Sequence, residues 1–199
     1  LTSVWRLSGS GEYNETVPVL NQAGELVSTD VARVCDVDIA VRWGNGYGTT
    51  VKSFVNVIAT PKGGSHLAGF EQAMLKFFKS QIETNSRKLK AGTDRPERED
   101  VLAGLTAIVT VRIAEPQFEG QTKEILGTPA VRQIVANVVS RGLTERFASS
   151  KRDDKAQTSL LLEKVVTEMK SRISARTHKE TQRRKNALEN SSLPTKLVD

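Results

Sequence analysis

The first third of the chain alternates polar and apolar residues, which indicates β-structure. Between positions 37 and 43 every second residue is apolar, and the residues between them include Asp38 and Arg42. A period of two is typical of a strand with one buried face. The segment 44–48 is rich in glycine and favours a turn. We therefore expect a hairpin in which 49–59 is the return strand.

Two more β-segments follow from the same pattern. Upstream, 12–20 and 25–34 are expected to form a second hairpin around Gly24. Downstream, 105–114 has apolar residues at every second position, and Ile108 makes its opposite face partly apolar. A strand with two apolar faces is typical of the middle of a sheet, so this strand is expected to be central.

Three later segments place apolar residues at the helical spacing of three and four. The first helix is expected to begin at Ser65, as N-cap, and to stop at Gly92. The second follows Thr128 as N-cap, with Pro129 at its first position. The third opens at Ser150, in a capping box with Asp in place of Glu. The residues expected to be buried in the first two helices are Leu67, Phe70, Met74, Phe77 or Phe78, Ile82, Val131, Ile134, Val135, Val138, Leu143 and Phe147.

The third helix is expected to span about forty residues, which is about 60 Å at 1.5 Å per residue. Its apolar stripe ends at Ile173, although nothing after that position breaks a helix. A helix that loses its apolar face leaves the globule. The core positions expected in its first half are Leu162, Val166, Met169 and Ile173.

This order of strands and helices predicts an α+β fold. Residues 1–150 are expected to form the domain, and residues 151–190 a helix that leads away from it. Residues 191–199, which contain Pro194, are expected to be a linker.

Composition narrows the class of protein. The chain has 199 residues, 38% of them hydrophobic, which is enough for one domain with an extension. It contains no run of about 20 apolar residues and no signal peptide, so no membrane role is expected. Cys35 is the single cysteine, which excludes an internal disulfide and fits a cytoplasmic protein. Because the sequence begins with Leu1 rather than Met, we interpret it as an excised fragment.

Positive charge is concentrated near the C-terminus. The window 170–185 has seven basic residues and one acid, so its net charge of +6 equals that of the whole chain. Arg172, Arg176, Lys179 and Arg183 fall on one side of the predicted helix. Nucleic acid is the natural partner of such a face. The alternative is an ordinary solvated helix face.

The sequence contains few signs of catalytic chemistry. It has no Walker A sequence and no cluster of Cys and His at metal-ligand spacing, so no metal, cofactor or catalytic residue is expected in the chain itself. The exception is the loop 116–123, which follows a predicted buried strand. In it, Lys123 could bring a point charge to a terminal phosphate, and Gln121 could donate an amide hydrogen bond or orient water. The alternative is a surface loop with an ordinary lysine.

Several segments resemble one family, the ATPase (B) subunits of bacterial type IIA topoisomerases, which comprise DNA gyrase and topoisomerase IV. Phe118–Lys123 is similar to the family's QTK loop, which is the most specific match. Ser53–Asn56 and Gly63–Phe70 resemble its SFVN and GGTHxxGF segments, with Ser65 in place of Thr.

Two further segments extend the resemblance over nearly the whole chain. Asp100–Ala107 resembles a D-x-R-x-G-L-x-A stretch, with Leu102 at the usually basic position. Residues 183–197 resemble the run into a metal-binding TOPRIM domain. Glu71 departs from the family, because many relatives have a basic residue after Gly-Phe, and a DNA contact is not carried over to it.

The resemblance implies that the chain is the transducer segment of such a subunit. The implied fold is a GHMP-kinase/ribosomal-protein-like sandwich, with a mixed sheet and helices on one face. An upstream ATPase domain would bind Mg-ATP and dimerise, Lys123 would contact the γ-phosphate, and Gln121 would be its companion. The long helix would carry the movement toward the TOPRIM domain and the A-type cleavage subunit, with Arg172, Arg176, Lys179 and Arg183 near DNA. The fragment alone would hydrolyse no ATP and cut no DNA.

Other functions stay open at this point. The resemblance does not separate gyrase from topoisomerase IV. A freestanding nucleic-acid-binding module would use the basic helix alone. A small-molecule kinase of the GHMP type would use Gly63–Ser65 as a phosphate loop. Such a kinase would also need a longer loop rich in Gly and Ser and a catalytic acid nearby, and neither is evident in the sequence.

Overall fold

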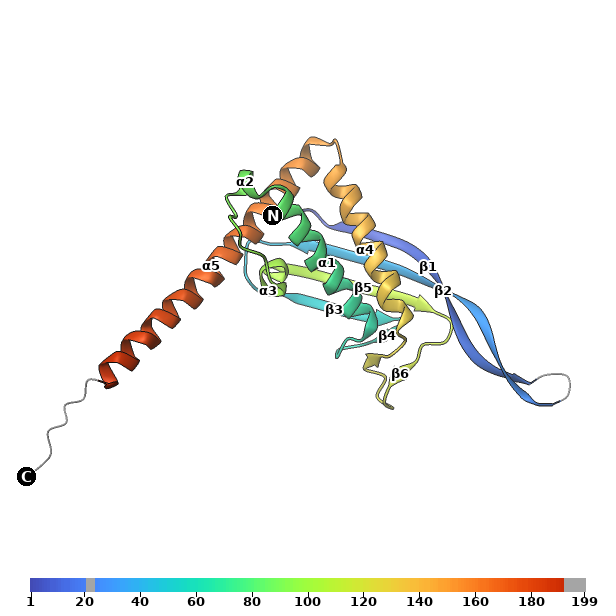
Figure 1. Cartoon of the computed structure of the whole chain (residues 1–199). Helices are drawn as coiled ribbons and strands as arrows, with labels where there is room; N and C mark the ends of the chain where they lie inside the picture. Colours follow the sequence, from blue (N-terminus) through green and yellow to red (C-terminus); the bar gives the residue numbers. More distant parts are fainter. Residues whose placement is uncertain (21–23, 192–199) are drawn as a thin grey trace, which may run out of the picture.

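A five-stranded mixed sheet forms the centre of the molecule (Figure 1). The structure, a computed structural model, describes residues 1–20 and 24–191, and for residues 188–191 the backbone alone. The strands are ordered β1-β2-β5-β3-β4, and all neighbours are antiparallel except β3 and β5. The strands span Trp5–Leu20 (β1), Leu26–Trp43 (β2), Thr50–Val55 (β3), Ile58–Ala59 (β4) and Leu105–Ile113 (β5).

Two helices, α1 and α4, lie side by side on one face of this sheet (Figure 1). The chain then leaves the body in α5, which is 40 residues long. The helices span Ser65–Thr84 (α1), Ser86–Leu89 (α2), Arg98–Leu102 (α3), Ala130–Ala148 (α4) and Arg152–Ser191 (α5). The fold is therefore α+β with a mixed sheet, as the sequence predicts.

The predicted hairpin between 37–43 and 49–59 is wrong. Strand β5 lies between β2 and β3, and β3 pairs with it in parallel. The glycine-rich segment 44–48 is a connection that passes the end of β5, since the Gly44 amide donates to the Gly104 carbonyl at 2.9 Å. Glycine-rich turn residues occur both in hairpins and in wider connections. The sequence pattern therefore could not show which strand pairs with which.

The predicted hairpin around Gly24 is confirmed, but it is much longer than expected. The segments 25–34 and 37–43 belong to one strand, β2, which pairs with β1 from Trp5↔Val41 to Leu20↔Leu26. The far half of this pair projects from the body as an arm (Figure 1).

The central place of β5 is confirmed, but the reason given for it is not. Its alternate residues Leu105, Val109 and Val111 are buried at 0% exposure, whereas Ile108 on the opposite face is 47% exposed. One sheet face thus carries the core and the other is open. Pairing along both edges, rather than burial of both faces, makes this strand central.

Aromatic residues fill the core where the sheet, α1 and α4 meet. Trp5 and Trp43 pack with ring centroids 5.6 Å apart, and Phe77 and Phe147 with centroids 4.9 Å apart. Of the residues expected to be buried in the first two helices, Leu67 and Phe147 are only partly buried and the others are buried.

Several helix ends differ from expectation. At α1 the N-cap is Gly64, and the Ser65 hydroxyl is buried without a hydrogen-bond partner among the described residues. This helix ends at Thr84, followed by the short α2, so Gly92 does not stop it. The predicted cap assumed that the Ser65 hydroxyl turns back to the helix, whereas Gly64, which lies against the Leu126 backbone, occupies the cap position.

The other two predicted caps are also wrong. At α4 the N-cap is Pro129, and the Thr128 hydroxyl accepts a hydrogen bond from the Gln117 amide instead. Before α5, Ser149 rather than Ser150 interacts with the helix, donating to the Asp154 carboxylate at 2.6 Å.

The second half of α5 carries no buried side chains among those that the structure describes. Leu162, Val166 and Met169 are buried, Ile173 is half-buried, and every side chain from 174 to 187 is exposed. Within the described residues, no helix combines the length and the apolar character needed to cross a bilayer. The linker expected over 191–199 lies outside the described residues, apart from the backbone of Ser191.

Candidate functional site

The loop that contains Gln121 and Lys123 folds into a small hairpin. Its strands are β6 (Phe118–Glu119) and β7 (Ile125–Leu126), which pair antiparallel. The hairpin lies beside the end of the body where α1 and α4 begin (Figure 1). Residues 120–124, between the two short strands, form its tip.

Backbone contacts dock this hairpin on the segment before α1. The Leu126 amide donates to the Gly63 carbonyl at 3.1 Å, Gly64 bridges to Leu126, and the Leu126 side chain is 1% exposed. Gly64 has φ 133°, and a Cβ at this position would overlap the Leu126 backbone. Only glycine fits this close approach.

The same contacts exclude one function. A phosphate loop needs free backbone amides aimed at a ligand. Here the Gly63 amide donates to the Thr60 carbonyl at 2.9 Å and the Leu126 backbone lies against Gly64, so the Gly63–Ser65 segment does not form the phosphate loop that a GHMP-type kinase would need.

A second set of hydrogen bonds closes the base of the hairpin. The Gly127 amide donates to the Gln117 carbonyl at 2.7 Å, and the Gln117 amide donates to the Thr128 hydroxyl at 3.1 Å. The Gln117 side chain also donates to Glu15 of β1 at 3.0 Å. The base is thus tied to the segment that precedes α4 and to the sheet.

At the tip, both predicted site residues face solvent. Gln121 and Lys123 are exposed, and neither side chain forms a hydrogen bond or ion pair with any part of the chain that the structure describes. The Lys123 backbone has φ 54°, which is unusual for a residue other than glycine. The ammonium of Lys123 is consequently available to an external anion.

The neighbouring carboxylate, that of Glu124, is bound by Lys62 and Thr122. Its Oε2 atom lies 2.6 Å from Lys62 Nζ and accepts a hydrogen bond from the Thr122 hydroxyl at 3.1 Å. The Lys62 and Thr122 contacts hold the pKa of Glu124 below its usual range. Lys62 and Glu124 were not singled out from sequence, although each stands next to a segment that was.

A buried polar network lies under the docking segment. The Ser53 hydroxyl donates to the Thr60 carbonyl at 2.8 Å, and the Thr60 hydroxyl lies 3.1 Å from His66 Nε2. Burial lowers the pKa of His66 to about 4, so its imidazole is neutral near pH 7. This geometry is consistent with a structural role at the start of α1.

The structure separates the four basic residues that the helical pattern groups together. Arg172 is only 17% exposed and binds the buried Asp100 carboxylate through two nitrogens, with Nε–Oδ1 and Nη2–Oδ2 distances of 2.9 Å. Its Nη1 lies 2.9 Å from Glu97. Arg172 therefore makes a tertiary contact between α5 and α3. The expectation that its guanidinium faces DNA is not supported.

The other three remain on an open helix face. Arg176, Lys179 and Arg183 are exposed, and Arg176 has only a long contact of 3.8 Å with Glu97. Periodicity placed all four on one side, but it could not show that α3 lies against the first of them.

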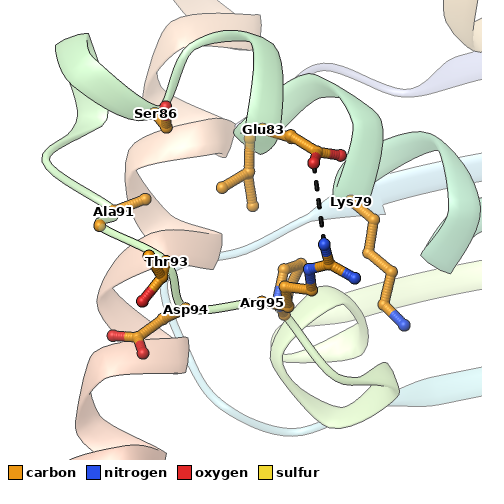
Figure 2. Close-up of a pocket in the computed structure, with 10 residues that line it drawn as sticks. Lys79, Glu83, Ser86, Ala91, Thr93, Asp94 and Arg95 are labelled. Carbon is orange, nitrogen blue, oxygen red and sulfur yellow. Dashed lines mark ion pairs between the residues drawn. The ribbon is translucent and has the colours of Figure 1, made fainter.

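A pocket of about 360 Å³ lies elsewhere, between the end of α1 and the loop 91–96 (Figure 2). Its charged lining mixes both signs, namely Lys79, Glu83, Asp94 and Arg95, and Glu83 and Arg95 form an ion pair at 3.8 Å. No group of three or more His, Cys, Asp or Glu side chains suited to a metal ion occurs in the described ranges. The hairpin tip is thus the stronger candidate site.

Comparisons with known proteins show the family to which the chain belongs. Residues 7–181 match the family model described as DNA gyrase B. The DNA gyrase B protein of Treponema denticola is 42% identical over 165 residues, and that of Staphylococcus epidermidis is 38% identical over 164 residues. These matches cover 81% and 82% of this chain. The chain spans about a quarter of the length of these relatives, since each match covers 25% of the relative.

Two solved structures have the same fold over most of the chain. One is the 43K ATPase domain of Thermus thermophilus gyrase B in complex with an aminocoumarin, with a TM-score of 0.62 and 29% identity over 74% of this chain and 38% of that one. The other is the topoisomerase IV ATP-binding domain of Francisella tularensis in complex with a small-molecule inhibitor, with a TM-score of 0.59 and 30% identity over 70% of this chain and 37% of that one. On the extent of the family match and on its identity to curated relatives, this chain belongs to the DNA gyrase B family.

Proposed function

We propose that this chain is the transducer segment of the ATPase subunit of a bacterial type IIA topoisomerase, with the GHMP-kinase/ribosomal-protein-like form of the α+β fold. Residues 1–150 are the transducer domain, 151–190 its exit helix, and 191–199 the linker to a TOPRIM domain. The observation that carries the proposal is Lys123: its ammonium has no partner among the described residues, on a hairpin that is docked to the body at both its base and its side.

The comparisons support a neighbouring nucleotide site. The matched solved chains are named as an ATPase domain and an ATP-binding domain, and this chain corresponds to 38% and 37% of them. The remainder of such a chain has room for the nucleotide-binding fold that this sequence lacks. Activity of the parent protein is therefore ATP-dependent DNA topoisomerisation, in a homodimer that acts with an A-type cleavage subunit.

The hairpin chemistry suits a terminal phosphate and not a metal. Lys123 supplies a strongly hydrated point charge, which phosphate oxygens attract, and Gln121 supplies an amide donor from the same tip. No acidic cluster for Mg²⁺ occurs among the described residues, so any magnesium belongs to the parent's nucleotide site. In the proposed mechanism, Lys123 holds the γ-phosphate, and loss of that group after hydrolysis frees the hairpin.

The exit helix transmits the change to the DNA gate. Its first half is packed in the core, so a rotation of the body rotates α5 as a lever. Arg176, Lys179 and Arg183 on its exposed part lie near the transported DNA segment.

Lys123→Ala tests the proposal in the chain joined to the nucleotide-binding region of its own full-length protein. We expect ATP hydrolysis to fall by about a hundred-fold, because one preorganised charge is removed from the transition state. Lys76→Ala, which removes an exposed lysine of α1, is the matched control and should leave the rate unchanged. An unchanged rate in Lys123→Ala would refute the contact.

A second candidate is a nucleic-acid-binding module, which the exposed arginines and lysine of α5 favour. Such a module should bind DNA at micromolar or lower concentration as an isolated chain, with a steep salt dependence. The transducer proposal predicts weaker binding, because the DNA contacts of the parent are shared with its other regions.

A further inference from the structure

The carboxylate of Glu124 joins two parts of the candidate site, the hairpin tip and the segment on which the hairpin docks. One oxygen, Oε2, is shared by the Lys62 ammonium at 2.6 Å and the Thr122 hydroxyl at 3.1 Å. Lys62 belongs to the segment on which the hairpin docks, and Thr122 belongs to the hairpin tip. This shared oxygen therefore links the tip to the body at a point separate from the backbone contacts of Leu126.

Lys123 lies between the two linked tip residues. Its backbone is in the left-handed region at φ 54°, where a residue with a side chain is unfavourable. Such a conformation persists when surrounding contacts hold it. The Thr122–Glu124 hydrogen bond closes the turn around Lys123, and the Lys62 ion pair fixes the closed turn to the body.

The ion pair also decides which lysine the carboxylate binds. Glu124 is adjacent to Lys123 in the chain and is 31% exposed, so an unpaired carboxylate here would compete with any anion for the Lys123 ammonium. With Lys62 in place, Glu124 is neutralised by a cation that comes from the body. Lys123 is left without an acidic partner among the described residues.

We propose that Lys62 and Glu124 are positioning residues for Lys123: their ion pair holds the turn in which Lys123 points outward, and keeps the Glu124 carboxylate from binding Lys123. The inference rests on the proposed function of Lys123 as the phosphate contact. It adds two residues that act through Lys123 rather than on the phosphate.

A charge swap tests this in the chain joined to its nucleotide-binding region. Lys62→Glu and Glu124→Lys should each lower ATP hydrolysis by about tenfold, and the double variant, which restores the pair with reversed charges, should return to within about threefold of wild type. These fold-changes follow from a charge-assisted contact of the usual strength. Lys76→Glu reverses the charge of an unrelated exposed lysine and should have no effect.

The outcomes separate this inference from the proposed function. If Lys123→Ala lowers ATP hydrolysis but Lys62→Glu and Glu124→Lys do not, Lys62 and Glu124 do not position Lys123. The same conclusion follows if the double variant hydrolyses ATP as slowly as the slower single variant. If Lys123→Ala itself is without effect, the phosphate contact fails. The swap should act mainly on kcat, because a displaced lysine weakens a contact made most strongly in the transition state, whereas a loss confined to KM contradicts the positioning role.

A second readout needs only the 199-residue chain and no nucleotide. In a carbon-13 NMR titration, the Glu124 carboxyl should have a pKa below that of an ordinary glutamate, and Lys62→Ala should raise it toward the ordinary value. Lys52→Ala, at another exposed lysine, should leave it unchanged. A Glu124 pKa that does not respond to Lys62→Ala would show that the ion pair is absent in solution and would overturn the inference.

Discussion

Individual residues beneath the hairpin determine whether the candidate site can form. Gly64 has no side chain because Leu126 occupies the space, and His66 is neutral because it is buried against Thr60. Both lie in a segment that the sequence resemblance marks, but the resemblance gives no reason for either residue. The structure gives the reason, and each residue leads to a prediction.

Gly64→Ala is expected to destabilise the chain by about 2–3 kcal/mol, because alanine is strained at φ 133° and its Cβ overlaps the Leu126 backbone. The free energy of unfolding from urea denaturation measures this. Gly46→Ala is the matched control, because a Cβ at Gly46 meets nothing within 4 Å. Equal stabilities of the two variants would contradict the close docking of the hairpin.

His66 should make stability depend on pH. Folded His66 stays neutral to about pH 4, whereas an unfolded histidine takes up a proton near pH 6.5, so the unfolded chain binds more protons between these values. Protonation then favours unfolding, and stability falls as pH falls from 6.5 to 4, by about 3 kcal/mol at most.

Urea denaturation at several pH values between 4 and 7 checks this dependence. His66→Gln should flatten the slope in this window, whereas His178→Gln, which changes an exposed histidine, should not. The same slope in both variants would assign the effect to other groups.

At the scale of elements, sequence periodicity predicts whether a segment forms a strand or a helix. It predicts less well which other segment a strand pairs with. The strand over 105–114, the helices that follow Ser65 and Thr128, and the long helix that follows Ser150 were all expected, because alternation and helical spacing are local. The placing of β5 between β2 and β3 depends on contacts between segments more than fifty residues apart, and nothing local encodes it.

The candidate site shows the same division. Gln121 and Lys123 could be found from sequence because they lie together in a recognisable loop. The Lys62–Glu124 and Asp100–Arg172 pairs could not, because their partners are 62 and 72 residues apart and meet only in the folded chain. A charge pattern on one helix shows which residues share a face, but not which neighbouring element covers part of that face.

The ion pair between α5 and α3 should anchor the start of the lever. Arg172→Ala is expected to cost about 2–3 kcal/mol, since it leaves the Asp100 carboxylate, which is 3% exposed, without its bidentate partner. Arg176→Ala, one turn further on and exposed, should cost less than about 0.5 kcal/mol.

Urea denaturation of the two arginine variants gives the comparison. Similar losses would mean that Arg172 is no more anchored than an ordinary surface arginine. A larger loss of stability in Arg172→Ala would confirm that Arg172 anchors the helix to α3, whereas Arg176 is an ordinary exposed arginine.

On the scale of the whole molecule, two extensions project from one α+β body. The β1–β2 arm and the α5 helix leave it on opposite sides, and the β6–β7 hairpin lies at the end of the body where α1 and α4 begin (Figure 1). The hairpin docks on the segment before α1, and α1 and α4 both contact α5, so packed elements link the hairpin to the base of α5. This arrangement suits a part that converts a small local contact into movement of a long helix.

The exposed half of α5 should interact with DNA through charge alone. For the isolated chain, replacing Arg176, Lys179 and Arg183 with alanine should make the negative slope of log K against log salt shallower by about 3, since each phosphate contact contributes about −0.9. Fluorescence anisotropy with duplex DNA at several salt concentrations measures the slope. The control replaces three exposed lysines of the body, Lys52, Lys76 and Lys79. An equal change in both triple variants would place the DNA contact outside α5.

The contact between Lys123 and a γ-phosphate is tested most directly by comparing affinities for a hydrolysis-resistant ATP analogue and for ADP. The measurement uses isothermal titration calorimetry on the chain joined to its nucleotide-binding region, as wild type and as Lys123→Ala. The account predicts that the variant loses about tenfold or more in affinity for the triphosphate, because a charge-assisted hydrogen bond is removed, and changes by less than about twofold for ADP. An equal loss for both nucleotides, or no loss for either, would contradict it.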